Sequence, residues 1–243
     1  MQTKMIPAAL SALALALAAG SAHAGPVADG SALAGWTTAG DVAAVDGHLV
    51  VTNASHTFAD DADNGLADTG ARNVSHTDPL PTGNGPGSLE EALGLAGAPF
   101  EAFGTSWEGS AVSQTFDAAA GGQLTFSWDL RTLDQRDPAQ ADWAFIVIDG
   151  QVLKLADAFA ASTGNADADY AAATGWLPSA PYTFAAGGSH AISFGVVDVG
   201  DFNDTSALSI GDVRVSSVPE GSTLALMVAG LGLLAMHGRR RRA

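Results

Sequence analysis

Short runs of β-branched and aromatic residues, bounded by glycine, aspartate or asparagine, recur along the middle of this chain. Such runs are typical of strands. In residues 123–130, apolar and polar side chains alternate, which predicts that Leu124, Phe126, Trp128 and Leu130 face a core. Residues 143–148 are apolar throughout, as expected of a strand buried on both faces.

These patterns predict an all-β domain, folded as a two-sheet antiparallel sandwich or jelly roll. Asp149 and Gly150 predict a type I′ hairpin turn. Ser88 followed by Glu91 predicts a capping box, which opens a helix over residues 89–95 that Gly97 ends. The predicted strands are residues 48–52, 111–116, 123–130, 143–148, 151–155, 182–184, 190–198 and 207–215.

The two ends of the chain have the composition of processing segments. Lys4 precedes an apolar run over residues 8–19, and Ala22 and Ala24 fit the small-residue pattern that signal peptidase recognises. Residues 1–24 are therefore predicted to be a signal peptide, with a signal helix, that sends residues 25–217 across the inner membrane as an extracellular domain.

Residues 222–238 carry no charged side chain if His237 is neutral, and four arginines follow directly. At about 1.5 Å per residue, this stretch is long enough for a short transmembrane helix. The positive-inside rule places the arginine cluster in the cytoplasm and the preceding domain outside. The cluster consists of Arg239, Arg240, Arg241 and Arg242.

Val218, Pro219 and Glu220 stand directly before this apolar stretch. The order of motif, helix and arginines resembles the PEP-CTERM sorting signal of bacteria that make extracellular polysaccharide. The resemblance covers residues 218–243 and implies cleavage near the motif by an exosortase-type membrane protease, followed by delivery to the cell surface or medium. Gly221 departs from the family's motif, and a plain C-terminal membrane anchor is the alternative.

The body also resembles a group of PEP-CTERM substrates over residues 89–156. The resemblance rests on residues 89–96, 108–111, 114–116, 124–128 and 142–145. It implies a β-sandwich extracellular protein, and it implies no particular activity.

The formal net charge is −16, and the chain contains no cysteine. Because Lys4 and the arginine cluster lie in the terminal segments, the body is more acidic than the whole chain. Such a surface repels nucleic acid, which is therefore a poor partner. Without cysteine, catalysis by a thiol and metal sites with thiolate ligands are excluded.

Calcium is the metal that the acidic loops favour, because Ca²⁺ prefers carboxylate and amide oxygens. The first candidate loop holds Asp60, Asp61, Asp63, Asn64 and Asp68, although its spacing is not that of an EF-hand. A second acidic set is Asp134, Asp137 and Asp142. Solvated acidic loops are the alternative.

Sugar-binding β-sandwiches use exposed aromatic rings, on which the apolar faces of sugars stack. Trp36, Trp107 and Trp176 lie next to glycines or in predicted loops and are the candidate platforms. Ser106 and Glu108 are the weak candidates for hydrolytic chemistry, since the glycine spacing around Ser106 does not match a nucleophile elbow.

The sequence therefore predicts a non-catalytic exported protein of the cell surface or extracellular matrix, associated with exopolysaccharide or biofilm. A calcium-assisted carbohydrate-binding module is the main alternative, and a secreted hydrolase is the third.

Overall fold

The computed structural model describes residues 33–54, 72–73, 87–134, 137, 139–200, 204–216 and 229–231. The strands are β1 (Thr37–Ala39), β2 (Asp41–Val45), β3 (His48–Thr52), β4 (Arg72–Asn73), β5 (Ser106–Ala118), β6 (Gln123–Thr132), β7 (Trp143–Ile148), β8 (Gln151–Asp157), β9 (Ala172–Ala173), β10 (Leu177–Pro178), β11 (Tyr182–Thr183), β12 (Gly188–Val199) and β13 (Ser206–Ser216). The helix α1 spans Leu89–Leu93, and three 3₁₀ turns are η2 (Pro99–Phe103), η3 (Ala158–Ala160) and η4 (Thr163–Asn165).

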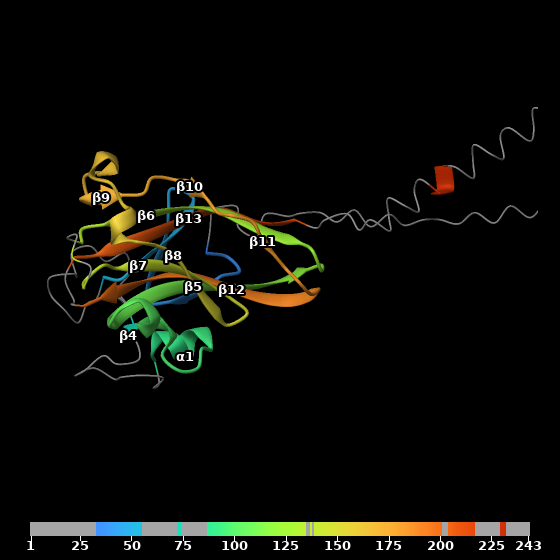
Figure 1. Ribbon diagram of the computed structural model, residues 1–243, viewed down its shortest axis with the longest axis horizontal. Coiled ribbons are helices and arrows are strands. Elements are labelled where there is room, and N and C mark those ends of the chain that lie inside the picture. Colours follow the sequence, from blue (N-terminus) through green and yellow to red (C-terminus); the bar gives the residue numbers. More distant parts are fainter. Residues whose placement is uncertain are drawn as a thin grey trace, which may run out of the picture.

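Two antiparallel sheets pack face to face (Figure 1). Sheet A has the strand order β10-β6-β13-β3-β2, and the short strands β9 and β11 also pair with β6. Sheet B has the order β1-β5-β12-β7-β8, with β4 added on β5. The all-β class and the two antiparallel sheets that the sequence predicts are confirmed.

The predicted strands correspond to β3, β5, β6, β7, β8, β11, β12 and β13, and several of these strands run a few residues further than predicted. The alternation did not reveal β1, β2, β4, β9 and β10. The members of this group have at most five residues each, which is too short for a period-2 pattern to stand out.

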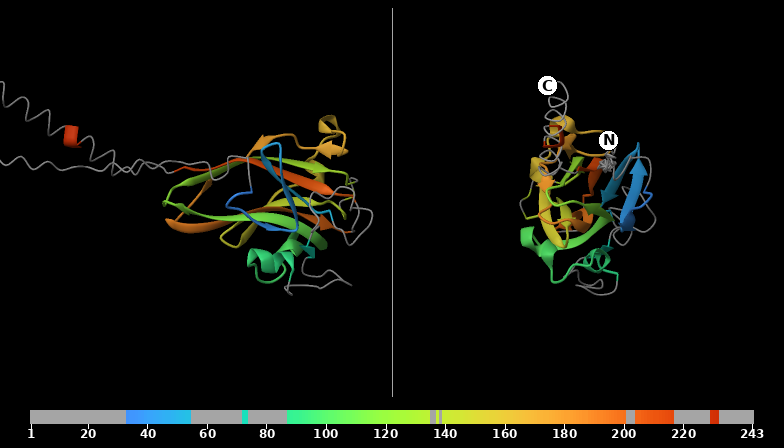
Figure 2. Two further views of the ribbon diagram at one scale, coloured as in Figure 1. Left: turned by 180° about the vertical axis from the view of Figure 1, so that it is seen from behind. Right: turned by 90° about the vertical axis from the view of Figure 1, so that its right-hand side faces the viewer.

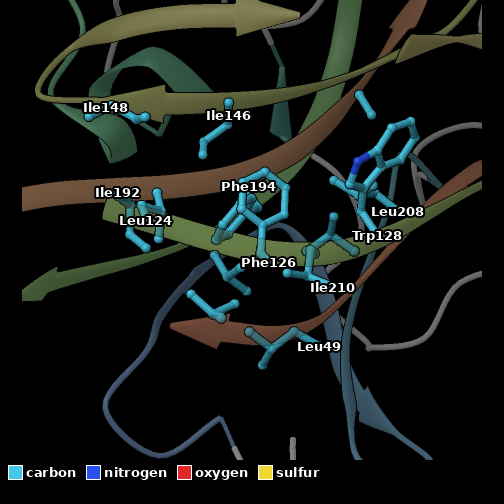
Figure 3. Packing of buried hydrophobic residues seen from close by; sticks show 14 of the residues in the cluster. Leu49, Leu124, Phe126, Trp128, Ile146, Ile148, Ile192, Phe194, Leu208 and Ile210 are labelled. Carbon is cyan, nitrogen blue, oxygen red and sulfur yellow. The ribbon is translucent and has the colours of Figure 1, made fainter. Parts of the chain in front are cut away.

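The main core lies between the sheets and is filled by alternate residues of both. Phe126 of β6 and Phe194 of β12 meet there with ring centroids 4.8 Å apart (Figure 3). Leu124, Phe126, Trp128 and Leu130 are all buried, as the alternation predicts.

A second apolar cluster covers the outer face of sheet B, where α1 and η2 lie against the strands (Figure 2). Phe100 of η2 packs against Phe145 of β7 at 4.9 Å and against Trp143 at 6.1 Å. Strand β7 is consequently buried on both faces, as its composition predicts.

The helix α1 begins as predicted and ends earlier. Ser88 is its N-cap and accepts a hydrogen bond from the Glu91 N–H, and the Glu91 carboxylate accepts one from the Gly87 N–H. Gly94, with a φ of 65°, terminates the helix after Leu93, so the predicted extension to residue 95 and its end at Gly97 are wrong. A left-handed glycine is a common helix terminator, and Gly94 is the first available.

Asp142 joins the two sheets at one end of the core. Its carboxylate accepts hydrogen bonds from Asn53 Nδ2 (2.7 Å), which follows β3 in sheet A, and from the Val199 N–H (3.0 Å) at the end of β12 in sheet B. Burial, and secondly the nearby charge of Asp134, raise the pKa of Asp142 well above its usual value.

Two hairpins turn through Asp–Gly pairs. Asp149 (φ 50°) and Gly150 (φ 82°) join β7 to β8, which confirms the predicted type I′ turn. Asp46 (φ 49°) and Gly47 (φ 81°) make the same turn between β2 and β3. His190 Nδ1 lies 2.7 Å from Asp149 Oδ2, and this hydrogen bond lowers the pKa of Asp149.

No helix among the described ranges is long and apolar enough to cross a membrane. The predicted signal helix and most of the predicted transmembrane stretch fall outside those ranges.

Candidate functional site

The outer face of sheet A is polar where three neighbouring strands lie side by side. Asp129 of β6, Ser209 of β13 and Val50 of β3 form one row across the sheet. The residues on either side of each, such as Leu208 and Ile210, point the other way into the main core. The alternation that builds the core therefore also turns Asp129 and Ser209 to the outer face, beside the apolar Val50.

Next to this row lies a pair of rings in tilted contact. The centroids of His48 and Trp176 are 4.4 Å apart, and Trp176 remains 46% exposed. Gly211 makes the arrangement possible, because a Cβ there would lie 2.8 Å from His48 Cδ2. The His48 ring thus uses the space above Gly211 and supports the indole from beneath.

The loop that carries Trp176 is fastened to β6 through Thr174. Thr174 Oγ1 accepts a hydrogen bond from the Leu130 N–H (2.9 Å) and donates one to Asp129 Oδ1 (3.1 Å). Asn165 Nδ2 donates to the carbonyl oxygen of Thr174 at 3.2 Å. Gly175 takes a φ of 69°, which few other residues tolerate, so the chain turns there and directs Trp176 over the sheet.

Arg131, two residues beyond Asp129 on β6, is held by several groups. Its guanidinium donates to Ser209 Oγ (2.6 Å), pairs with Asp167 (3.4 Å) and lies over the Tyr170 ring at 5.4 Å. Burial acts to raise the pKa of Asp167, but hydrogen bonds from the Asp169 and Tyr170 N–H groups and from Arg131 lower it overall. Burial raises the pKa of Tyr170 to about 12.

These residues enclose a groove of about 280 Å³ on the outer face of sheet A. Its lining combines one exposed indole with carboxylates, an amide, a hydroxyl and a guanidinium. An aromatic platform beside several hydrogen-bonding groups is suited to binding a polar ring compound with an apolar face. The lining residues are Val45, Asp46, His48, Val50, Asp129, Arg131, Asn165, Asp167, Ala173, Gly175, Trp176 and Ser209.

The three tryptophans proposed as platforms have different environments. Trp36 is only 8% exposed and packs against Phe194 in the main core, so its interpretation as an exposed platform is wrong. The reason is that Leu33 and Trp36, which precede β1, both pack against the main core. Trp107 is half-buried on β5, and Trp176 alone lines a groove of the described region.

The first predicted calcium loop, with Asp60, Asp61, Asp63, Asn64 and Asp68, lies outside the described residues. In the second acidic set, Asp134 Oδ2 accepts the Asp142 N–H at 3.0 Å, while Asp137 is exposed. Within the described ranges, no group of acidic and histidine side chains is arranged to hold a metal ion. Calcium binding remains a prediction about the first loop.

Val218, Pro219, Glu220, the arginine cluster, Ala22 and Ala24 also lie outside the described residues. Strand β13 ends at Ser216, shortly before the predicted sorting motif.

The weak hydrolase candidates are buried. Ser106 Oγ donates to the Phe100 carbonyl oxygen at 2.9 Å, which ties η2 to β5. Glu108 is buried on the same strand. Neither side chain is accessible to a substrate in solution.

A second groove, of about 380 Å³, opens between the edges of the two sheets at β8 and at β10 and β11. Core side chains such as Phe126, Ile146 and Ile148 form its floor. Ser179, one of its polar residues, already accepts the Phe126 N–H at 3.0 Å. This groove offers little to orient a polar ligand, so the groove at Trp176 is the candidate site.

Several residues of the site were not singled out by the sequence, notably Arg131, Asn165, Asp167 and Gly211. The alternation in residues 123–130 does predict that Asp129 faces outward, which is a partial signal. The others lie on separate strands and loops, and only the fold brings them together.

No protein-family model matches this chain, and a comparison with curated proteins finds no related sequence.

Proposed function

We propose that this protein is an exported, non-catalytic cell-surface or matrix protein that binds exopolysaccharide through the groove at Trp176. The terminal segments are proposed to determine where the protein goes. The signal peptide directs export, and an exosortase-type protease then sorts the protein through its C-terminal signal. The groove carries the proposed activity.

The observation that supports glycan binding is the exposed Trp176 ring, which the His48 ring holds in place. An indole that is 46% exposed leaves apolar area available for stacking, and His48 and Gly211 fix its position. Hydroxyl groups of a stacked sugar would find acceptors and donors at Asp129, Arg131 and Asn165, which line the same groove. A preformed aromatic surface costs little entropy on binding.

The surroundings of the groove favour binding over hydrolysis. Glycoside hydrolysis needs a pair of carboxyl groups, one of which has a raised pKa and reaches the sugar. The pKa of Asp167 in the groove is lowered. Asp142, whose pKa is raised, is buried between the sheets and does not line the groove.

The test of this function is the binding of host exopolysaccharide and defined oligosaccharides by the mature domain and by Trp176→Ala. Loss of one stacking contact is expected to weaken binding about two- to twelvefold, since aromatic stacking is worth about 0.5–1.5 kcal/mol. Phe159→Ala is the matched control, because Phe159 is an exposed aromatic residue outside the groove. Equal binding by Trp176→Ala and the parent would refute the proposed site.

The sorting part has a separate test, the intact mass of the protein in membrane, surface and medium fractions of the native host. A species that starts near Gly25 and ends near Val218 is expected. Replacement of the arginine cluster by neutral residues should disturb orientation and processing. If the protein in the membrane fraction retained Arg239 to Arg242, the C-terminal segment would be a plain membrane anchor and not a sorting signal.

A further inference from the structure

The groove at Trp176 has an unequal balance of charge. Asp46, Asp129 and Asp167 contribute carboxylates, whereas Arg131 is the only arginine or lysine among its lining residues. His48, the other basic residue, has its ring against the Trp176 indole. A ligand in this groove therefore meets mainly negative charge.

The single guanidinium is already engaged by the protein. Arg131 is bonded to Ser209, paired with Asp167 and placed 3.8 Å from Asp129, and its face lies on Tyr170. Because Asp167 and Asp129 already balance the charge of Arg131, an acidic sugar would meet two carboxylates beside the one guanidinium of the groove. The formal net charge of −16 adds repulsion at longer range.

Asp46 is the carboxylate with most freedom to act on a ligand. It is exposed at the tip of the β2–β3 hairpin, and it takes part in none of the ion pairs of the described residues. The type I′ turn holds it at the rim of the groove, on the same hairpin as His48. A protonated amine on a stacked sugar would be attracted to this group.

Resting on the proposed glycan-binding function, we infer that the groove discriminates by charge: it takes amino-sugar glycans first, neutral glycans next, and excludes uronic-acid glycans. Trp176 supplies stacking to every sugar. Asp46 supplies the preference for the amine, and the carboxylates that already neutralise Arg131 repel acidic sugars.

The experiment measures the affinity of the mature domain for oligomers of glucosamine, N-acetylglucosamine and galacturonic acid of equal length. It is done at physiological salt and at a pH where the amine is protonated. The glucosamine oligomer is expected to bind about two- to fivefold more tightly than its N-acetyl form, the range typical of an exposed ion pair. The galacturonate oligomer is expected to bind most weakly.

Asp46→Asn tests the residue assigned to the preference. Asparagine is favoured before glycine in a type I′ turn, so the hairpin should be preserved while the charge is lost. Asp117→Asn is the control, because Asp117 is exposed on β5 of the other sheet and its replacement changes the net charge equally. Asp46→Asn should bind both glucosamine forms alike, and Asp117→Asn should retain the preference.

If Asp46→Asn and Asp117→Asn lost the preference for the glucosamine oligomer equally, the preference would come from the overall charge of the protein, and the inference would be overturned. Binding of galacturonate as tight as that of the neutral oligomer would also overturn it. In both cases a requirement for Trp176 would leave the proposed function standing. Failure of all three oligomers and of host polysaccharide to bind would overturn the function and the inference together.

Discussion

The outer faces of the two sheets serve opposite purposes. On sheet B, α1 and η2 cover the strands and form a second apolar cluster around Phe100 and Trp143. On sheet A, the segment that carries η3 and η4 covers only the part around Tyr170, and a polar groove remains open beside it. One face therefore contributes to stability, while the other is kept accessible with its side chains held in place by hydrogen bonds.

This difference shows how a sandwich without disulfides can keep an open face. The apolar burial on sheet B and between the sheets supplies the stability that the groove does not. Residues on the outer face of sheet A are then free to serve binding. Their replacement should lower ligand affinity more than it lowers the free energy of unfolding.

The largest expected effect tests the closed face. Phe100→Ala should lower the free energy of unfolding by about 3–5 kcal/mol, because it leaves a cavity among fully buried rings. Denaturant unfolding would measure the change. Trp176→Ala in the same assay should change stability by no more than about 0.5 kcal/mol, as expected of an exposed residue. Comparable losses in the two variants would mean that the faces do not differ as described.

The second prediction concerns the Asp142 link between the sheets. Because the pKa of Asp142 is raised, the folded protein keeps a proton that the unfolded chain has released. The free energy of unfolding should therefore fall as the pH rises from the ordinary aspartate range through the folded pKa. Each tenfold difference in proton affinity is worth about 1.4 kcal/mol.

Asp142→Asn should remove this part of the pH dependence, which unfolding curves over a range of pH would reveal. Asp137→Asn is the control, since Asp137 is exposed and near in sequence. If the free energy of unfolding of Asp142→Asn depended on pH as steeply as that of the parent protein, other groups would be responsible for this pH dependence.

The sequence predicted the closed parts of the molecule better than the open one. Alternation identified Phe126 and Trp128 as core residues, and the capping box located the start of α1, because these signals are local. The groove depends on His48, Trp176 and Gly211, which are far apart in the sequence. Their contact follows from the order β6-β13-β3 in sheet A, which no local pattern specifies. Trp36 was misjudged for the same reason, because its burial depends on Phe194 of a distant strand.

The smallest expected effect tests the support of Trp176. Gly211→Ala places a methyl group against the His48 ring, which must then tilt and displace the indole. Binding to the best oligosaccharide should weaken about two- to fivefold, a change below 1 kcal/mol by the usual conversion. Titration calorimetry would measure it.

A double variant, Gly211→Ala with Trp176→Ala, should bind no more weakly than Trp176→Ala alone, because the glycine acts through the indole. Additive losses would contradict this role for Gly211.

The interrupted outer edge of sheet A has one more consequence. Strands β9, β10 and β11 each pair with a different part of β6, and Pro178 in β10 has no N–H to offer to a further strand. A neighbouring copy of the protein cannot extend such an edge into a continuous intermolecular sheet. Protection of this edge against pairing with another copy and display of the Trp176 loop, which leads into β10, thus come from the same break in the edge.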